Sequence, residues 1–429
     1  QLITGLHRAA SVGLDNDSPP LLEATLEAWI AWIFADRNID VPEEIAPPEA
    51  AWWVSEMHQR IEAIQILVSN YCPWMLPEFA PLRSVKQLET ADWWACSSLE
   101  DAPDFTAHLQ SMLADVHGLP EGMEASSSER LRVLLGPALE HQKSLIHSLQ
   151  SVAARAFRLV EQMDFGFLLE KGRQLLSIGY EVRTNKLYAA TYDMLASEAR
   201  IATFLAIAKG DIPQQSWFKL SRTHTITFGR AILLSWTGTM FEYLMPSLWM
   251  RSYPETLIAP TLTAAVEIQR VYAQKLNIPW GISESGYAKT DSEGHYQYHA
   301  FGIPEVALKW NMAAGPVVSP YSSFLALGTD APQALKNLHR MSSMGWEGMY
   351  GFYEAADYSQ SPRHPEIVRE WMAHHLGMSL LAILNLLQDN VVQTWFHSNP
   401  QLQAAELLLH ERPIRKAIIR TEYKRFAPK

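Results

Sequence analysis

The chain has 429 residues, which is enough for two or three domains or for one large helical domain. Its 35 Lys and Arg residues against 46 Asp and Glu give a formal charge of −11, so neither nucleic acid nor an anionic membrane is the expected partner. Charged residues make up only 19% and hydrophobic residues 48%, with 15 each of Trp, Tyr and Phe, and this composition indicates an ordered globular protein.

Two cysteines, Cys72 and Cys96, are too few for a disulfide framework and lack the spacing of a zinc site. The opening segment lacks the basic and apolar regions of a signal peptide, and we interpret the chain as a fragment of something longer. The most apolar stretch, Ile232–Met250, contains Glu242. Because an unpaired carboxylate is unfavourable in lipid, no membrane span is expected.

The first part of the chain, residues 1–160, is predicted to be a helical N-terminal or linker region. Apolar residues recur there near the helical period of 3.6 residues, for example at Met57, Ile61 and Ile64. The three serines at 126–128 predict an N-cap for a long helix that runs to about Met163.

The second part, residues 161–429, is predicted to begin with a short β-hairpin in MDFGFLLEKGRQLLSIGYEV, with its turn at Lys171 and Gly172. Helices are then expected at Tyr192–Lys209, Arg230–Met250, Glu255–Lys275, Tyr321–Leu327, Ala331–Met344 and His374–Leu387. Strands and helices do not alternate as in a doubly wound sheet. A ring of antiparallel helix pairs explains this pattern best.

Carboxylates stand inside otherwise uncharged aromatic segments of this second part: Asp193, Glu198, Glu242, Glu284, Glu354 and Asp357. An isolated carboxylate in an apolar setting is costly unless it is paired, hydrogen-bonded or protonated, so such positions are enriched in acid/base sites. Glu198, Glu242 and Glu284 are 44 and 42 residues apart, about one helical hairpin each. In a helical toroid this spacing predicts that all three lie at the same mouth.

Glycoside cleavage needs two carboxyl groups that flank the scissile bond. Glu284 is the favoured catalytic candidate, because it lies in the glycine-containing loop PWGISESGY beside two rings that could stack on sugars, Trp280 and Tyr287. Glu198 could be catalytic or could form a structural ion pair with Arg200. Glu242 could contact substrate or be a buried, hydrogen-bonded carboxylate.

Glu354 and Asp357 lie in YGFYEAADY, which resembles a loop or a tight helix start suited to binding sugar hydroxyls. His374 and His375 are adjacent, so on a helix they point about 100° apart and cannot form an i,i+4 metal pair; a hydrogen-bonding role is preferred. The sequence also lacks the GxSxG, GxxxxGKS and GxGxxG motifs. Neither a metal nor a cofactor is therefore expected.

Taken together, residues from about Met163 to Pro413 resemble the glucoamylase-like domain in the middle of cyclic β-1,2-glucan synthases. The segments that carry the resemblance include YDMLASEARIATFLAIAKGDIP, LLSWTGTMFEYLMP, PWGISESGY, YQYHAFGIP, YGFYEAADY and MAHHLGMSL. The resemblance implies an all-α fold, an (α/α)6 barrel, that performs anomer-retaining transglycosylation on linear β-1,2-glucan and closes it into a ring. Residues before 160 resemble only the helical linker that precedes this domain.

The same resemblance implies that Glu284 is the nucleophile and Glu198 the acid/base. The predicted substrate-binding residues are Asp193, Trp236, Glu242, Tyr243, Trp280, Tyr287, Tyr298, Tyr353, Glu354, Asp357, His374 and His375. The expected partners are a β-1,2-glucan oligosaccharide or polysaccharide and other domains of a larger synthase, on the cytoplasmic side of a bacterial inner membrane or as a soluble cytoplasmic protein. The alternatives are an endo-β-1,2-glucanase on the same fold and a non-catalytic glucan-binding domain.

Overall fold

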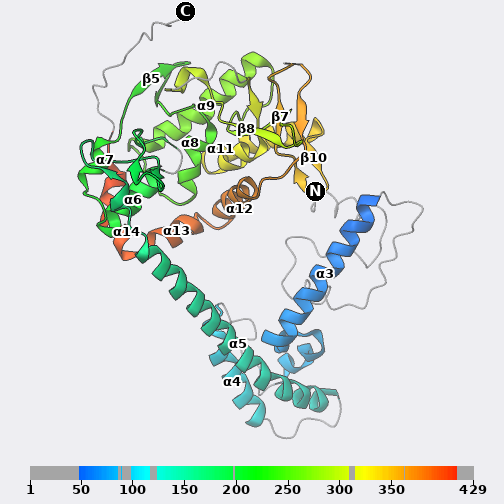
Figure 1. Ribbon diagram of the computed structural model, residues 1–429. Helices are drawn as coiled ribbons and strands as arrows, with labels where there is room; N and C mark the ends of the chain where they lie inside the picture. The colour runs from blue at the N-terminus through cyan, green and yellow to red at the C-terminus, as the bar shows by residue number, and fades with distance from the viewer. Residues whose placement is uncertain are drawn as a thin grey trace, which may run out of the picture. The chain divides into compact units, whose positions relative to one another are not determined.

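The computed structural model describes residues 48–85, 88, 98–115, 123–196, 199–308, 315–361 and 363–412 (Figure 1). The chain divides into two compact units, Gln1–Gln162 and Met163–Lys429. The assignment of the first as a linker region and of the second as a catalytic domain stays a prediction.

The described part of the first unit is helical. Its elements are α3 (Pro48–Tyr71), the 3-10 helices η1 (Pro73–Met75) and η2 (Pro77–Ser84), α4 (Ala102–Asp115) and α5 (Met123–Gln162). Buried side chains from η1, η2, α4 and α5, such as Trp74, Phe79, Leu109 and Leu131, form its core. The long predicted helix is confirmed as α5, with 40 residues, but the serine cap is wrong because the helix already begins at Met123.

The second unit begins with η3 (Gly166–Leu168) and the predicted hairpin, in which β1 (Leu169–Glu170) pairs with β2 (Leu175–Leu176). A second small hairpin, β3 (Tyr180–Glu181) with β4 (Lys186–Leu187), follows it.

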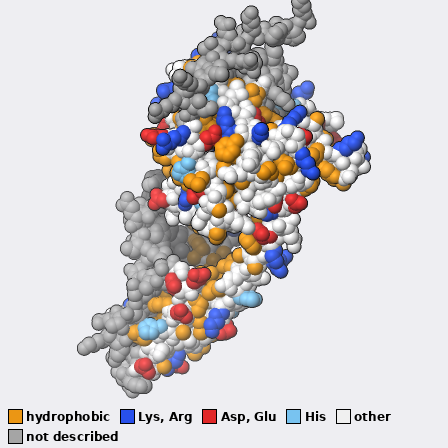
Figure 2. All heavy atoms as spheres, turned by 90° about the vertical axis from the view of Figure 1, so that its left-hand side faces the viewer, with side chains coloured by type: hydrophobic (Ala, Val, Ile, Leu, Met, Phe, Trp, Pro, Cys, Tyr) orange, Lys and Arg blue, Asp and Glu red, His pale blue; other side chains and the backbone are white. Residues whose placement is uncertain are grey.

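Acidic and basic side chains are interspersed over the described surface that Figure 2 shows, in keeping with a chain that carries both signs throughout.

Helices make up most of the rest of the second unit: α6 (Ala199–Lys209), α7 (Gln215–Lys219), α8 (Met240–Leu244), α9 (Ile258–Leu276), α10 (Pro320–Leu325), α11 (Leu327–Ser343), α12 (Ala373–Leu387), α13 (Val391–His397) and α14 (Pro400–Ala405). Short 3-10 helices add η4 (Met245–Leu248), η5 (Pro304–Val306) and η6 (Glu406–His410). Helix α9 packs against α8 and α11, and α10 packs against α8, α11 and α12. This mostly helical architecture agrees with the predicted (α/α)6 barrel.

One predicted helix, Arg230–Met250, is wrong. Its first part forms a hairpin in which β6 (Arg230–Leu233) pairs with β5 (His224–Thr227), and helical structure resumes only at α8. Gly238 has a φ of +78°, a left-handed conformation that no helix interior accommodates, and Thr239 caps the new helix. The predicted helix Tyr192–Lys209 is correct only from Ala199, where α6 begins.

Several short strands surround the loops that carry the candidate carboxylates: β7 (Ser285–Thr290) with β8 (Tyr296–His299), β10 (Glu347–Gly348) with β11 (Gly351–Phe352), and β9 (Val317–Val318), β12 (Ala355–Asp357) and β13 (Glu366–Val368) in the order β13-β12-β9. The prediction of a loop or helix start for Glu354 and Asp357 is wrong for Asp357, which ends β12, whereas Glu354 directly precedes that strand. The pairing of β12 with β13 and β9 explains how a polar segment becomes buried here.

Two glycines join distant loops by direct backbone contact. A Cβ on Gly302 would lie only 2.1 Å from the carbonyl carbon of Gly238, and the Ile303 N–H donates a hydrogen bond to the Gly238 carbonyl at 3.0 Å. The loop before α8 is thereby held against the loop after β8. Among the described helices, none is both long and apolar enough to cross a membrane.

Candidate active site

The loop that carries Glu284 is fixed from three sides. The Tyr321 hydroxyl, on α10, donates to the Glu284 carbonyl at 2.9 Å and lies 2.7 Å from the Ser283 hydroxyl. The Phe241 N–H, on α8, donates to the same Ser283 hydroxyl at 3.0 Å. On α9, the Gln269 amide group bonds to both backbone groups of Ile282 at 2.9 Å. The half-buried Glu284 is therefore presented by a rigid backbone.

A buried pair of ionisable side chains lies next to this loop. Nδ1 of His375, on α12, donates to the carboxylate of Glu354 at 2.8 and 3.0 Å, and the two residues are only 2% and 5% exposed. The His375 ring stacks on Tyr321 with ring centroids 3.7 Å apart. The Glu354 carboxylate also accepts a hydrogen bond of 3.4 Å from the N–H of Gly286, two residues after Glu284. The structure thus brings the predicted residues Glu284, Glu354 and His375 into one cluster.

A third carboxylate in this cluster, Glu370, was not predicted from the sequence. Its Oε1 lies 2.5 Å from the position that a Cβ on Gly286 would occupy, and Cγ of Glu354 lies 3.5 Å from the same point. The Glu354 N–H donates to the Glu370 carbonyl at 3.0 Å. One available signal was that Glu370 directly precedes Trp371 and Met372, an apolar setting like that of the other candidates.

Burial and nearby charge shift the pKa values of this cluster. Burial raises the pKa of Glu370, and the negative charge of Glu354 raises it further, while His375 acts in the opposite direction. Burial is also the main reason why the pKa of Tyr321 is raised, with further contributions from Tyr298, Glu284 and Glu354. The hydroxyl of Tyr321 therefore stays protonated and can go on donating to the Glu284 carbonyl.

Exposed rings border the buried pair. Tyr298, on β8, is 42% exposed, and its ring centroid lies 6.4 Å from that of His374 and 6.3 Å from that of His375. His374 is exposed at the start of α12, and burial of part of its ring lowers its pKa. These two rings are accessible to a ligand at the edge of the cluster.

Glu242 has a different environment, although it is also buried. Its carboxylate accepts hydrogen bonds from the Ser235 hydroxyl at 2.8 Å, the Thr237 N–H at 3.0 and 3.1 Å, and the Thr239 N–H and hydroxyl at 3.1 and 3.2 Å. With Thr239 it forms the capping box of α8. Of the two interpretations left open by the sequence, these contacts favour the buried, hydrogen-bonded carboxylate. A substrate-binding role for Glu242 stays a prediction.

Three of the predicted aromatic residues are buried. Tyr243 donates to the Leu233 carbonyl at 2.7 Å, Tyr287 donates to the Gly315 carbonyl at 3.0 Å, and Trp280 is 7% exposed. Tyr353 is half-buried and lies against Trp371, with ring centroids 5.2 Å apart.

Three further predicted residues, Trp236, Asp193 and Asp357, make contacts with other parts of the second unit. Trp236 stacks on Tyr192 with centroids 6.3 Å apart. Asp193 accepts hydrogen bonds from the Met194 N–H and from the Ser221 N–H. Asp357 accepts from the Ala288 and Ser359 N–H groups at 3.0 and 2.7 Å. Glu198 lies outside the described residues, so its position relative to Glu284 stays a prediction.

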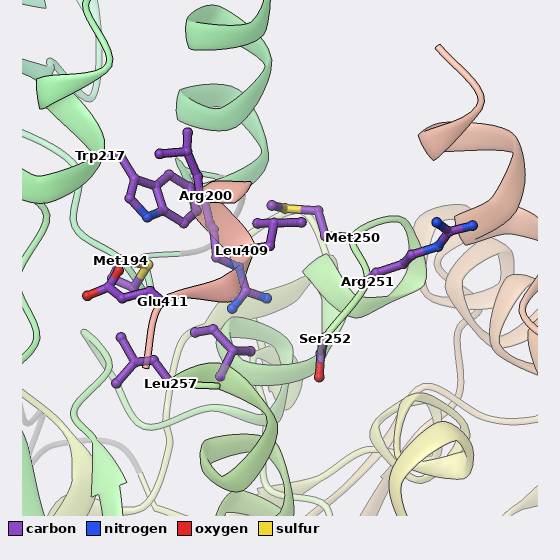
Figure 3. Close-up of a pocket in the computed structure, with 11 residues that line it drawn as sticks. Met194, Arg200, Trp217, Met250, Arg251, Ser252, Leu257, Leu409 and Glu411 are labelled. Carbon is purple, nitrogen blue, oxygen red and sulfur yellow. The ribbon is translucent and has the colours of Figure 1, made fainter. Parts of the chain in front are cut away.

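Two pockets lie away from this cluster. The smaller one is lined by Arg200, Trp217 and Glu411 among others, and it contains none of the predicted site residues. Figure 3 shows the guanidinium of Arg200 among the lining residues. Burial lowers the pKa of Arg200 to about 10. A larger pocket of about 740 Å³ lies between α9 and α11, and of the predicted residues only Trp280 lines it.

In the described part of the chain, no group of three His, Cys, Asp or Glu side chains is placed to hold a metal ion. The geometry instead offers a half-buried carboxylate, a histidine–carboxylate pair and a further carboxylate beside exposed rings. This is a combination suited to acid/base and nucleophilic chemistry on a hydroxyl-rich ligand.

Residues 191–400 match the family model described as "Putative glucoamylase". This stretch of the chain is similar to a glucoamylase-like domain. Over 263 residues it is 43% identical to the "Cyclic beta-(1,2)-glucan synthase NdvB" of Rhizobium meliloti (strain 1021), a match that covers 60% of this chain and 9% of the synthase. These two matches confirm the predicted resemblance. The chain spans only this small fraction of the relative's length.

Solved structures that match part of this chain include a putative glucoamylase from Bacteroides caccae ATCC 43185, with 15% identity, 73% of this chain and 71% of that chain covered, and a TM-score of 0.45. Another is the endo-β-1,2-glucanase of Chitinophaga pinensis in complex with sophorotriose and glucose, with 16% identity, coverage of 72% and 69%, and a TM-score of 0.45.

Proposed function

We propose that the glucoamylase-like domain is an anomer-retaining transglycosidase that acts on β-1,2-glucan and cyclises a linear chain by intramolecular transfer. The observation that carries the proposal is the 43% identity over 263 residues to a cyclic β-1,2-glucan synthase. The cluster around Glu284 supports it, because retaining transfer requires a carboxylate nucleophile on a fixed backbone.

In the proposed reaction, Glu198 donates a proton to the glycosidic oxygen while a carboxylate oxygen of Glu284 attacks the anomeric carbon. The bond to the leaving sugar breaks and a glycosyl-enzyme forms. A 2-hydroxyl at the other end of the same glucan chain then attacks the anomeric carbon, and Glu198 accepts its proton. The Glu284 carboxylate leaves, and a ring is released.

The surroundings of Glu284 fit the demands of this reaction. The histidine–carboxylate pair of His375 and Glu354 offers polar groups for sugar hydroxyls, and the exposed ring of Tyr298 offers an apolar face for a sugar ring. Holding a sugar hydroxyl rather than water against the glycosyl-enzyme is what makes the product a ring.

Product analysis tests the proposal. Incubation with linear β-1,2-glucan should give products one water mass lighter than linear chains of the same length, as measured by mass spectrometry. The Glu284→Gln variant should give none, and Glu293→Gln, the same change at an exposed position, serves as its control. Linear shorter products would instead establish an endo-β-1,2-glucanase, and binding without any conversion would establish a glucan-binding domain.

Donor substrates with different leaving groups distinguish the acid/base role of Glu198 from the nucleophilic role of Glu284. Glu198→Gln should lose activity on glucan by roughly 10²- to 10⁴-fold but retain it on donors whose leaving group needs no protonation. Glu284→Gln should be inactive on both. Rescue by azide of Glu284→Gln but not of Glu198→Gln would contradict this assignment of the roles to the two residues.

The domain is further proposed to work within a larger synthase, together with other domains of that protein, on the cytoplasmic side of a bacterial inner membrane. The support is that the matching synthase is much longer than this chain. Fractionation of cells that express the full-length protein, with protease added to intact spheroplasts, tests this placement.

A further inference from the structure

Glu370 has a buried oxygen with an unusual environment. Its Oε1 is buried and has no hydrogen-bond partner among the described residues, although the residue as a whole is only half-buried. A buried carboxylate oxygen without a donor is costly when it is charged, and the cost falls when the group carries a proton. The proposed transfer reaction assigns no role to Glu370.

Gly286 connects Glu370 to the proposed nucleophile. The Glu370 carboxyl and the Glu354 side chain both lie against the α-carbon of Gly286, at 2.5 and 3.5 Å from where a Cβ would stand. The Gly286 N–H donates to the Glu354 carboxylate at 3.4 Å. Gly286 is the second residue of β7, and Glu284 directly precedes that strand. A displacement of Glu370 relative to Glu354 would therefore move the backbone that presents Glu284.

The ionisable groups around Glu370 come from three segments. Glu354, before β12, and His375, on α12, are the two whose charges act on it, and burial together with Glu354 raises its pKa. Glu284 belongs to the loop before β7, and His374 stands exposed beside His375.

The neighbouring Arg369 does not form an ion pair that would neutralise a charged Glu370. Its guanidinium lies over the ring of Tyr353, 5.6 Å from the centroid. Among the described residues, no cationic Lys or Arg side chain forms an ion pair with Glu370.

We propose that Glu370 is a positioning residue which, as the neutral acid, packs against Gly286 and keeps the Glu354–His375 pair and Glu284 in their working arrangement. When Glu370 ionises, it faces the Glu354 carboxylate as a like charge, and the repulsion weakens the contact of Glu354 with Gly286 and disturbs the Glu354–His375 pair beside Glu284. The role in catalysis rests on the proposed function, whereas the protonation of Glu370 does not.

The first test needs no substrate. Because the pKa of Glu370 is raised in the folded protein, its stabilising contribution is complete below the unfolded pKa and is lost as the pH rises through the folded pKa. Glu370→Gln cannot ionise and does not lose this stability. The unfolding midpoint of the variant minus that of the unmodified chain should therefore increase as the pH rises from about 4 to 8. Glu366→Gln, an exposed position on β13, should show a constant difference. A constant difference for Glu370→Gln as well would overturn the proposal.

The second test is the pH profile of kcat/KM on linear β-1,2-glucan. Glu370→Gln should shift the alkaline midpoint upward by at least about half a pH unit, since the repelling charge can no longer form. A purely structural role would lower the rate equally at every pH and leave the midpoint unchanged, and that result would refute the positioning role. If the unmodified chain does not convert the glucan, the proposed function fails, while the unfolding experiment still decides the protonation of Glu370.

Discussion

The loop before α8 and the cluster beside β7 each bury a glutamate, and they do so in opposite ways. Glu242 accepts hydrogen bonds from Ser235, Thr237 and Thr239, all within seven residues of it. Glu354 is held by His375 from a helix 21 residues further along, and beside it the Nε2 of His375 and the Oε1 of Glu370 are buried without a partner among the described residues. A carboxylate whose acceptors are filled by its own loop stabilises that loop, whereas Glu354 joins segments that are distant in the sequence and so holds the cluster together.

The largest expected effect tests whether the cluster beside β7 is where the reaction occurs. Glu284→Gln should lower transfer activity by roughly 10³-fold or more, because the nucleophilic carboxylate is removed while the Tyr321 hydrogen bond to the backbone stays. Initial rates on linear β-1,2-glucan measure this. Activity within tenfold of the unmodified chain would exclude Glu284 as the nucleophile.

The same substitution at Glu354 should have a smaller effect on activity. Glu354→Gln replaces a charge-assisted hydrogen bond from His375 with a weaker one to a neutral amide oxygen, and we expect kcat/KM to fall by roughly tenfold because the pair beside Glu284 is less firmly held. The thermal unfolding midpoint should change little, because an amide oxygen can still accept from Nδ1. A large drop in the unfolding midpoint with unchanged kcat/KM would instead show that Glu354, like Glu242, has a structural role.

At Glu242 the expected outcome is reversed. Glu242→Gln places an amide N–H₂ against donors of the α8 capping box, at a cost of about 1–3 kcal/mol of stability. For a domain of this size, each kcal/mol lowers the unfolding midpoint by roughly 2–4 °C. Well below that midpoint, kcat/KM should stay within about twofold of the unmodified chain. A catalytic loss without a loss of stability would show that Glu242 contacts substrate after all.

The smallest effect is expected at the edge of the cluster. Tyr298→Ala removes an exposed ring, and we expect KM for glucan to rise by roughly fivefold, about 1 kcal/mol, with kcat nearly unchanged. Tyr350→Ala, another exposed tyrosine on the same unit, is the control. Equal KM values for both variants would place the substrate elsewhere.

The sequence predicts those parts of the fold that depend on local periodicity. Helices α9 and α12 begin and end within three residues of the predicted bounds, because their apolar residues recur at the helical period. Around Gly238 the prediction fails, because apolar residues continue through a turn and a hairpin, and hydrophobicity alone does not distinguish these from a helix.

For the candidate site, the sequence identifies residue types but not their pairing. His375 and Glu354 could be singled out as polar residues in apolar segments, yet their hydrogen bond joins two segments 21 residues apart, and no local pattern reports that contact. Glu370 precedes the apolar Trp371 and Met372, but it also follows the charged Arg369, so this segment is less distinct in the sequence than those of the predicted carboxylates. The position of Glu370 against Gly286 and Glu354 arises only in the folded chain, where the Glu354 N–H donates to the Glu370 carbonyl.

The backbone contact between Gly238 and Gly302 has a consequence for protein engineering. Neither residue leaves space for a side chain, and Ile303 is hydrogen-bonded to Gly238, so the two loops form a matched pair. A chimera that takes the loop before α8 from one homologue and the loop after β8 from another would combine backbones that were never fitted to each other. Loop exchange between homologues should therefore transfer both segments together.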